Sequence, residues 1–262
     1  MKFHLRWAVA ALSVIALSVS SLAQAASVSG QGTWQTTLQA RSFNGGATIG
    51  GYYDTALNIT WLADANYANT SGYASGTGGA MTWSQANAWA ASLNLNGITG
   101  WSLPTTGPVN GSISNYNYSC SDNGSTDCGY NISAPGSAYP GSTGSQMAHM
   151  FYVTLGNTGL YNTSGNPQAS YGLTNTGPFS NIQSNQYWSA TAYAPFPNSN
   201  AWYFNNNDGG QNDFNQSVSL YAWAVHSGDV GTPVPVPEPA SVWLFGSGVL
   251  MLLGMSGKRR RC

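Results

Sequence analysis

Apolar and polar side chains alternate over residues 56–61, and this period of two predicts a half-buried β-strand. A Gly- and Ser-rich loop follows, and the period then changes to that of a helix. Four apolar residues at i, i+3, i+4 and i+7 form one stripe: Ala86, Trp89, Ala90 and Leu93. Thr82 and Gln85 have the spacing of a capping box, and Gly97 is expected to end the helix.

The second half of the chain predicts one more helix and three strands. The helix covers about residues 146–155 and is closed by Gly156. Its inward-facing residues are expected to be Met147, Met150, Phe151 and Leu155. Strands are expected at 187–192, 201–205 and 218–226, and the last carries bulky residues on both faces, as a central strand does. Residues 108–144 show no period and are interpreted as a long insertion.

The N-terminal end is typical of an export signal. A short basic patch precedes an apolar run over residues 7–19, and Ala23-Gln24-Ala25 supplies small residues at a cleavage site. Residues 1–25 are therefore predicted to be a signal peptide cut after Ala25. The alternative is an uncleaved membrane anchor, but the run is short for that role.

The C-terminal end, residues 233–262, predicts a sorting tail. Pro237-Glu238-Pro239 leads into an apolar stretch over 241–255, which is close to the minimum length for crossing a bilayer. The basic cluster at 258–261 is expected to stay in the cytoplasm. These three parts, in this order, resemble the PEP-CTERM sorting signal.

That resemblance implies processing by an exosortase, a membrane transpeptidase of Gram-negative bacteria that make exopolysaccharide. Cleavage near Pro237, Glu238 and Pro239 would follow a transient stay in the inner membrane. The product would reach the outer surface or the extracellular matrix. A plain uncleaved tail anchor is the alternative.

Charge is scarce in what remains, residues 26–232, which are expected to form one extracellular domain. Six of the seven Lys and Arg residues lie in the two end signals, so the mature chain has only Arg41. Against eight acidic residues, seven in this range and Glu238 at the start of the tail, this gives a net charge near −7. Nucleic-acid binding needs clustered cations and is excluded. The 10 Trp and 15 Tyr indicate a folded core, because disordered chains are poor in aromatic residues. Four tryptophans are expected in that core: Trp61, Trp89, Trp101 and Trp223.

Two cysteines of the insertion are expected to pair. Cys120 and Cys128 flank a turn-forming stretch, and the exported domain folds in an oxidising compartment. A disulfide that closes so small a loop is expected to contribute about 2–3 kcal/mol. Cys262 lies beyond the basic cluster and is not their partner.

Several segments resemble the Lcl C-terminal domain family, over about residues 52–228. They include Leu57-Asn58-Ile59-Thr60-Trp61, Gly100-Trp101-Ser102-Leu103-Pro104, Tyr187-Trp188-Ser189 and Tyr221-Ala222-Trp223. The resemblance implies a C-type lectin-like fold of the α+β class, with two helices packed on a twisted antiparallel sheet and long loops. Members usually have arginine at the position of Ser102 and glutamate at the position of Gln146. A salt bridge that would hold this motif in place is therefore not expected in this chain.

Catalysis finds little support in the residue pattern. His149 and His226 stand without a partner motif, and no nucleophile elbow, zinc motif or phosphate loop is present. We therefore expect no enzyme activity and no cofactor. A secreted hydrolase that uses dispersed aspartates stays as a lower alternative. Residues 208–213 superficially resemble a calcium loop, but a hairpin turn is the simpler interpretation, and no metal site is expected.

A binding module is the favoured functional class. Tyr203 alternates with Trp202 and Phe204 and is expected to face outward. With four further residues it forms the predicted ligand site: Tyr193, Asn205, Asn206 and Asn207. Aromatic faces and amides suit a neutral polysaccharide, whereas the net charge disfavours sulfated or phosphorylated polymers. A structural matrix protein without a specific ligand is the rival interpretation.

Overall fold

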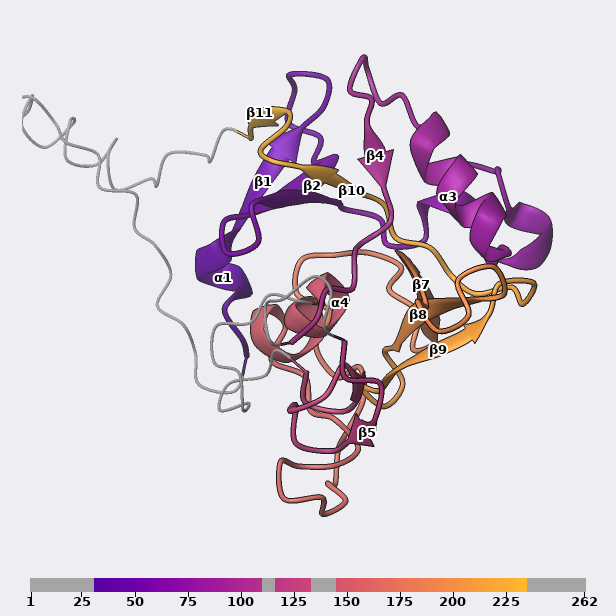
Figure 1. Ribbon diagram of the computed structural model, residues 1–262. Coiled ribbons are helices and arrows are strands. Elements are labelled where there is room, and N and C mark those ends of the chain that lie inside the picture. Colours follow the sequence, from indigo (N-terminus) through magenta and orange to yellow (C-terminus); the bar gives the residue numbers. More distant parts are fainter. Residues whose placement is uncertain (1–30, 110–115, 133–144, 235–262) are drawn as a thin grey trace, which may run out of the picture.

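The computed structural model describes residues 31–109, 116–132 and 145–234, which fold into two β-sheets with short helices beside them (Figure 1). The six-stranded sheet has the order β11-β1-β2-β3-β10-β4, and the five-stranded sheet the order β5-β6-β9-β8-β7. The strands of the first sheet are β1 (Leu38–Ser42), β2 (Gly51–Asp54), β3 (Ile59–Leu62), β4 (Trp101–Ser102), β10 (Val225–Ser227) and β11 (Thr232–Pro233). Those of the second are β5 (Cys120–Ser121), β6 (Cys128–Gly129), β7 (Gln186–Ala192), β8 (Asn200–Asn205) and β9 (Gln211–Asn215). The helical elements are α1 (Trp34–Thr37), α2 (Tyr67–Thr70), η1 (Ser75–Thr77), α3 (Trp83–Ser92), α4 (Gln146–His149) and η2 (Met150–Thr154).

The six-stranded sheet is antiparallel and joins the two ends of the described chain. β1, β2 and β3 follow one another as a meander, while β10 inserts beside β3 from the far end of the sequence. β11 pairs with β1 at one edge, and β4 pairs with β10 at the other. The first and last described strands are therefore direct neighbours, as Figure 1 shows for β1 and β11.

The strand predicted at 56–61 begins later, at Ile59. The preceding residues form a turn, because the Asp54 carboxylate accepts the backbone N–H groups of Ala56 at 2.9 Å and Leu57 at 3.2 Å. Asn58 has a φ of 53° and closes that turn. The alternating pattern was a correct sign of a strand, but the carboxylate of Asp54 decides where the strand starts.

The strand predicted at 218–226 is shorter than expected, since only Val225–Ser227 joins a sheet as β10. Leu220 forms an isolated bridge with Met81, and Tyr221 forms another with Tyr187 of the five-stranded sheet. Successive residues thus pair with different partners, so no continuous ladder can form. The bulky residues on both faces reflect a segment that runs between the sheets rather than a central strand.

The long helix is confirmed. Thr82 and Gln85 form the predicted capping box, and Ala86, Trp89 and Ala90 are buried. The helix ends at Ser92, however, and Gly97 does not terminate it. Asn96 and Gly97, with φ values of 55° and 89°, form a tight turn between the bridge partners Leu95 and Ile98. Asn-Gly is the residue pair that such a turn favours.

The second predicted helix is present but changes its winding. α4 continues into a π-helical turn, in which the N–H of Leu155 donates to the carbonyl of Met150 at 2.8 Å. All four residues predicted to face inward are buried: Met147, Met150, Phe151 and Leu155. Gly156, with a φ of 68°, follows the helix as predicted.

The insertion extends the five-stranded sheet. The predicted disulfide between Cys120 and Cys128 is present, and β5 and β6 run parallel beside it. Gly129 of β6 pairs with Gln211 of β9, which attaches the insertion to the β7–β9 meander. In Figure 1 this part projects from the end of the molecule that is far from the six-stranded sheet.

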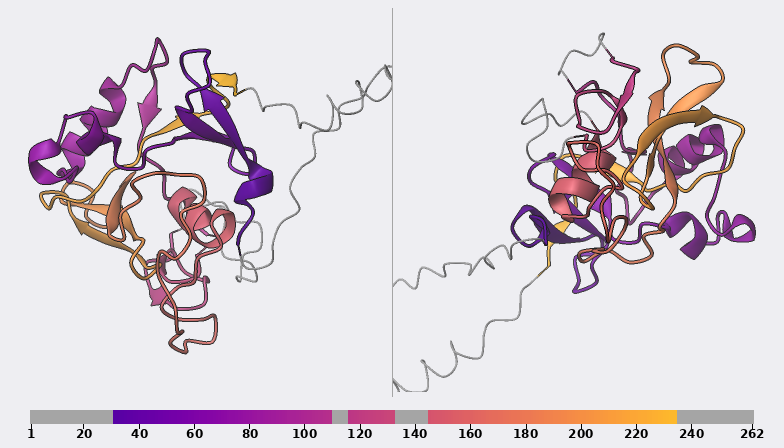
Figure 2. Two further views of the ribbon diagram at one scale, coloured as in Figure 1. Left: turned by 180° about the vertical axis from the view of Figure 1, so that it is seen from behind. Right: turned by 90° about the horizontal axis from the view of Figure 1, so that it is seen from below.

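The core between the elements is rich in tryptophan. The four tryptophans predicted to be buried are at most 2% exposed. Trp61 and Trp223 pack with ring centroids 4.8 Å apart, and the indole N–H of Trp223 donates to the carbonyl of Leu62 at 2.8 Å. α4 lies toward the middle of the molecule (Figure 1), and the views of Figure 2 agree. In η2, which follows it, Phe151 packs on Phe204 of β8 with ring centroids 5.3 Å apart.

The α+β class, with mainly antiparallel sheets, is confirmed by these elements. The likeness to C-type lectins and to the Lcl family stays a prediction. Within the described ranges, no helix is long and apolar enough to cross a membrane. The predicted signal peptide, both predicted cleavage sites and the apolar stretch at 241–255 lie outside those ranges.

Candidate functional site

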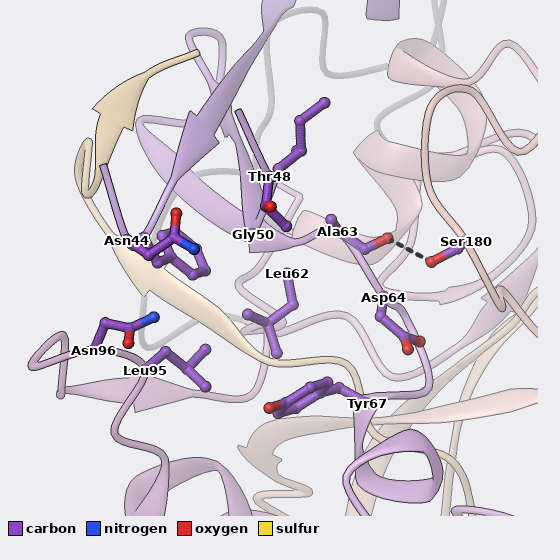
Figure 3. A pocket seen from close by; sticks show the side chains of 12 residues that line it. Asn44, Thr48, Gly50, Leu62, Ala63, Asp64, Tyr67, Leu95, Asn96 and Ser180 are labelled. Carbon is purple, nitrogen blue, oxygen red and sulfur yellow. Dashed lines mark hydrogen bonds between the residues drawn. The ribbon is translucent and has the colours of Figure 1, made fainter. Parts of the chain in front are cut away.

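A groove of about 280 Å³ opens beside the six-stranded sheet (Figure 3). Its walls come from the β1–β2 loop, from the residues that follow β3, and from the tight turn at Leu95 and Asn96. The floor is apolar: Leu62 is 2% exposed, and Phe43 and Leu95 pack against the core. Figure 3 shows Asn44 and Asn96 on one side of Leu62, with Asp64 and Ser180 on the other and the ring of Tyr67 below.

Local hydrogen bonds fix the side of the groove that carries Asp64. The segments around Ala63 and Ser180 bridge in both directions, since Ser180 N–H donates to Ala63 and Ala65 N–H donates to Ser180, each at 2.9 Å. One oxygen of Asp64 accepts the N–H of Asn66 at 2.9 Å. This Asx turn leads directly into α2, whose first residue is Tyr67.

The opposite side is fixed by two turns. Asn44 accepts bonds through its Oδ1 from the Ser42 hydroxyl at 2.8 Å and from the Gly46 N–H at 3.0 Å. Asn96 is held by its left-handed turn rather than by side-chain bonds. Both amides are therefore positioned at the groove by the backbone.

Five polar groups at the groove bond to no other described residue. They are the Nδ2 of Asn44, the hydroxyl of Thr48, the Oδ2 of Asp64, the hydroxyl of Tyr67 and the side-chain amide of Asn96. Together they offer donors and acceptors around an apolar floor and one aromatic ring. Asp64 is the single carboxylate among the lining residues.

The predicted ligand residues are divided between two places on the five-stranded sheet. Tyr203 and Asn205 line a smaller recess of about 130 Å³ together with Tyr130, Asp208 and the disulfide. Tyr203 is part-exposed and packs edge-on against Phe214 at 6.0 Å, whereas Trp202 and Phe204 are buried.

Tyr193 lies elsewhere. Its ring packs edge-on against Trp202 and Tyr118, each at 5.1 Å. Trp202 and Tyr203 are adjacent on β8 and point to opposite faces, so Tyr193 and Tyr203 do not share a surface.

The amides of the β8–β9 turn have structural partners. Asn206 is 3% exposed, and its Nδ2 lies 3.3 Å from the carbonyl of Gln183. Asn205 accepts the N–H of Asn207 at 3.1 Å, and Asn207 is exposed. The turn connects β8 and β9 directly, as the hairpin interpretation predicts.

Burial dominates the electrostatics of this recess. The pKa of Asp208 is raised by burial, although the Gly210 N–H donates to it at 2.8 Å. Burial and the charge of Asp208 raise the pKa of Tyr130 to about 12. The described residues contain no group of three or more His, Cys, Asp or Glu side chains that could hold a metal ion.

The two histidines of the described residues have different surroundings. His149 is buried, and burial lowers its pKa to about 4; its Nδ1 lies 3.3 Å from the Thr154 hydroxyl. His226 is on β10, with its ring nitrogens 2.6 Å from the Ser227 carbonyl and 2.9 Å from the Thr99 carbonyl. Neither lines the groove.

The groove residues were not predicted from the sequence to form a site. Asn96-Gly97 is a recognisable turn signal, and Asp64 followed by Asn66 is a turn-forming spacing. No local pattern, however, relates Asn44, Asp64 and Asn96, because only the pairing of β1 to β3 and the turn after α3 bring them together.

Comparison with known proteins identifies the tail. Residues 235–261 match the family model for the PEP-CTERM protein-sorting motif. This motif marks the chain as an exported protein that is processed by an exosortase and sorted to the cell surface. No curated protein and no solved structure gave a match to this chain.

Proposed function

We propose that the domain is a non-catalytic surface module that binds a neutral polysaccharide and holds one sugar unit in the groove of Figure 3. The observation that carries this proposal is the ring of unbonded polar groups around an apolar floor. Sugars present hydroxyl groups at their edges and C–H groups on their faces. Amides and a carboxylate match the hydroxyls, and the Tyr67 ring matches a face.

The size of the groove limits what it can hold. Its volume of about 280 Å³ lies just below the roughly 300–1,000 Å³ typical of small-molecule sites. One sugar ring therefore fits better than a longer segment. The rest of a polymer would leave through the open side.

Charge selects the class of polymer. Among the described residues Arg41 is the sole Lys or Arg, and its guanidinium is bound to the carboxylate of Asp229 at 2.6 Å. No cation therefore faces the groove, and Asp64 adds a negative charge to it. An anionic polymer would be repelled, whereas a neutral one would not.

The absence of a second carboxylate in the groove lining supports binding without cleavage. Glycoside hydrolysis ordinarily uses two carboxyl groups on either side of the bond, and the lining contains Asp64 alone. The recess with Tyr203 and Asn205 is the weaker, second contact of this proposal. Neither contact requires a cofactor.

The sorting tail supports a location that suits the proposed binding. A Gram-negative cell that makes exopolysaccharide would hold the protein briefly in its inner membrane and then deliver it to the surface or the matrix. There, exopolysaccharide would have access to the groove, and the proposal requires that this polymer be neutral. Cleavage near Pro237-Glu238-Pro239 is part of this proposal.

The test measures retention of the processed protein on immobilised neutral polysaccharides. Tyr67→Phe removes one hydroxyl, Asp64→Asn keeps the bond to Asn66 but removes the charge, and Asn96→Gly keeps the left-handed turn. Each variant is expected to weaken retention about fivefold or more, which corresponds to the loss of one hydrogen bond of about 1 kcal/mol. Tyr53→Phe is the matched control, because the Tyr53 hydroxyl bonds to Asn58 at 2.8 Å away from the groove.

Equal retention of the three groove variants and the control would contradict the groove as the binding site. A native protein that no neutral polysaccharide retains, but that stays in the matrix fraction, would instead support a structural role without a specific ligand.

A further inference from the structure

The last described strand ends where the sorting motif begins. β11 consists of Thr232 and Pro233, and the motif starts at residue 235. Arg41 lies opposite Pro233, and Ser42 lies opposite Thr232. The folded sheet therefore continues to the start of the sorting motif without a spacer.

Residues 229–234, which lead out of the sheet, are attached to it in two successive ways. The first is firm: Asp229 forms two bonds to the Arg41 guanidinium, at 2.6 and 2.8 Å, and the Val230 N–H donates to Thr60 at 3.2 Å. Gly231 then passes so close to β1 that an added Cβ would lie 2.7 Å from the Ser42 carbonyl oxygen. The chain is thus fixed in place up to Gly231.

The second attachment is a ladder of only two residue pairs, Arg41–Pro233 and Ser42–Thr232, in which Pro233 has no N–H to donate. Thr232 and Pro233 are exposed, so the two-residue strand covers no core. The Thr232 hydroxyl lies 3.4 Å from the Ser42 carbonyl, and the Val234 N–H lies 3.4 Å from the Ala40 carbonyl. Both distances are long for hydrogen bonds. β11 is an edge strand, so its detachment would leave the remaining five strands paired.

Chain geometry sets a limit on how far the processing site can lie from the sheet. A fully extended chain spans at most about 3.3–3.6 Å per residue. From Val234 to Glu238 the chain can therefore reach about 14 Å, whatever path it takes. A domain of about 200 residues has a radius of gyration of about 17 Å. With β11 paired, the folded domain would therefore clash sterically with any membrane enzyme that acts at Pro237-Glu238-Pro239.

Detachment of β11 removes much of this obstacle. From Gly231 to Glu238 the extended chain can reach about 25 Å. We propose that β11 is a releasable strap: it pairs with β1 in the folded domain and detaches when the sorting enzyme takes up the tail. Arg41 and Asp229 form the fixed point behind it, and the β1 edge is the face of the domain that meets the enzyme.

The test follows removal of the tail from the full-length chain, by mass spectrometry in pulse–chase samples from cells that contain the sorting enzyme. The double variant Ser42→Cys, Thr232→Cys would lock the strap, because directly opposed antiparallel residues have the Cα separation of a disulfide. We expect processing to slow at least about tenfold, since the paired state can no longer open. Each single variant is expected to be processed at the native rate.

A second variant separates a locked strap from a damaged fold. Inserting Gly-Ser-Gly-Ser between Val234 and Pro235 supplies the missing reach, so the locked protein with this spacer is expected to regain the native rate within about twofold. Processing of the locked protein at the native rate would overturn the proposal. Failure of the spacer to restore the locked protein would also overturn it. Neither outcome depends on polysaccharide binding, which is measured separately on the processed protein.

Discussion

Trp61 of the six-stranded sheet packs against Trp223 in an apolar core, whereas the insertion of the five-stranded sheet is held by a disulfide and polar side chains. The carboxylate of Asp127 accepts the N–H groups of Val109 at 2.5 Å and Asn117 at 2.6 Å. Gln211 donates to the Asp127 carbonyl at 2.7 Å. The first sheet is thus stabilised by apolar burial, and the insertion of the second by hydrogen bonds, although β7 and β8 of that second sheet also bury aromatic side chains.

The difference indicates which substitutions should destabilise each sheet. Loss of a tryptophan leaves a cavity in a close-packed core, and its cost spreads over the whole domain. Loss of the disulfide frees one loop while the β7–β9 meander keeps its own pairing. The groove lies beside the first sheet, so it should survive damage to the second.

The largest effect is expected for Trp223→Ala. Trp223 packs on Trp61 and Phe179, both at 4.8 Å, and its indole bonds to Leu62. We expect a loss of about 3–5 kcal/mol in the free energy of unfolding, measured by urea denaturation. Tyr73→Ala is the control, since Tyr73 is 56% exposed. A loss below about 1 kcal/mol for Trp223→Ala would show that the apolar core is not what stabilises this half.

Removal of the disulfide by Cys120→Ser with Cys128→Ser should cost less, about 2–3 kcal/mol. Amide hydrogen exchange should become faster in β5 and β6 and stay unchanged in β1 to β3. Retention on neutral polysaccharide should be preserved. Equal loss of protection in both sheets would contradict the separation of the two regions.

A smaller, pH-dependent effect is expected from His149. Burial lowers its folded pKa to about 4 from the ordinary value of 6.5, so the folded state favours the neutral ring. This contribution to stability is present above pH 6.5 and is lost as the pH falls toward 4. Between pH 7 and pH 5, the free energy of unfolding of the native protein should fall by about 2 kcal/mol more than that of the His149→Gln variant.

Comparison with the His149→Gln variant separates the pH-dependent contribution of the histidine to stability from that of the buried acids. Burial raises the pKa of Asp54, Asp127 and Asp208, which gives stability that increases as the pH falls, the opposite sign. These acids are present in both proteins, so their effect cancels in the difference. Parallel stability curves for the two proteins would refute the role given to His149.

The smallest effect is expected for Tyr203→Ala. Tyr203 is part-exposed, so the melting temperature should fall by no more than a few degrees. Retention on neutral polysaccharide should weaken about two- to threefold, less than for the groove variants. Unfolding of this variant would identify Tyr203 as a core residue, and unchanged retention would remove the recess from the binding surface.

Much of the fold could be predicted because apolar period and capping are local signals. The stripe on α3, the inward face of α4 and η2, and the pairing of Cys120 with Cys128 all depend on residues close in sequence. The boundaries that failed depend on distant or polar contacts. β3 begins later than predicted because Asp54 accepts two backbone N–H groups of the preceding turn. Tyr221 bridges with Tyr187 of the other sheet, so the predicted strand at 218–226 is interrupted there.

The candidate site was harder to predict than the fold. Tyr203 and Asn205 do meet in one recess, as their nearness in sequence suggests, but Tyr193 packs on the other face. The groove joins side chains from four separate segments, the fourth contributing Ser180, and β1 and β2 themselves were not predicted. Their residues alternate too weakly to be recognised, and they become strands because β1 pairs with β2 and β2 pairs with β3.

The most direct test of the binding proposal is a titration of the ¹⁵N-labelled, processed protein with a neutral oligosaccharide, followed by NMR. The largest amide shifts should occur at Asp64, Tyr67 and Asn96 and should saturate together, with smaller shifts at Tyr203 and Asn205. The Asp64→Asn variant should need a higher ligand concentration for the same shifts. Shifts confined to the β8–β9 turn, or no saturable shift with any neutral sugar, would contradict the proposal that the groove binds the polysaccharide.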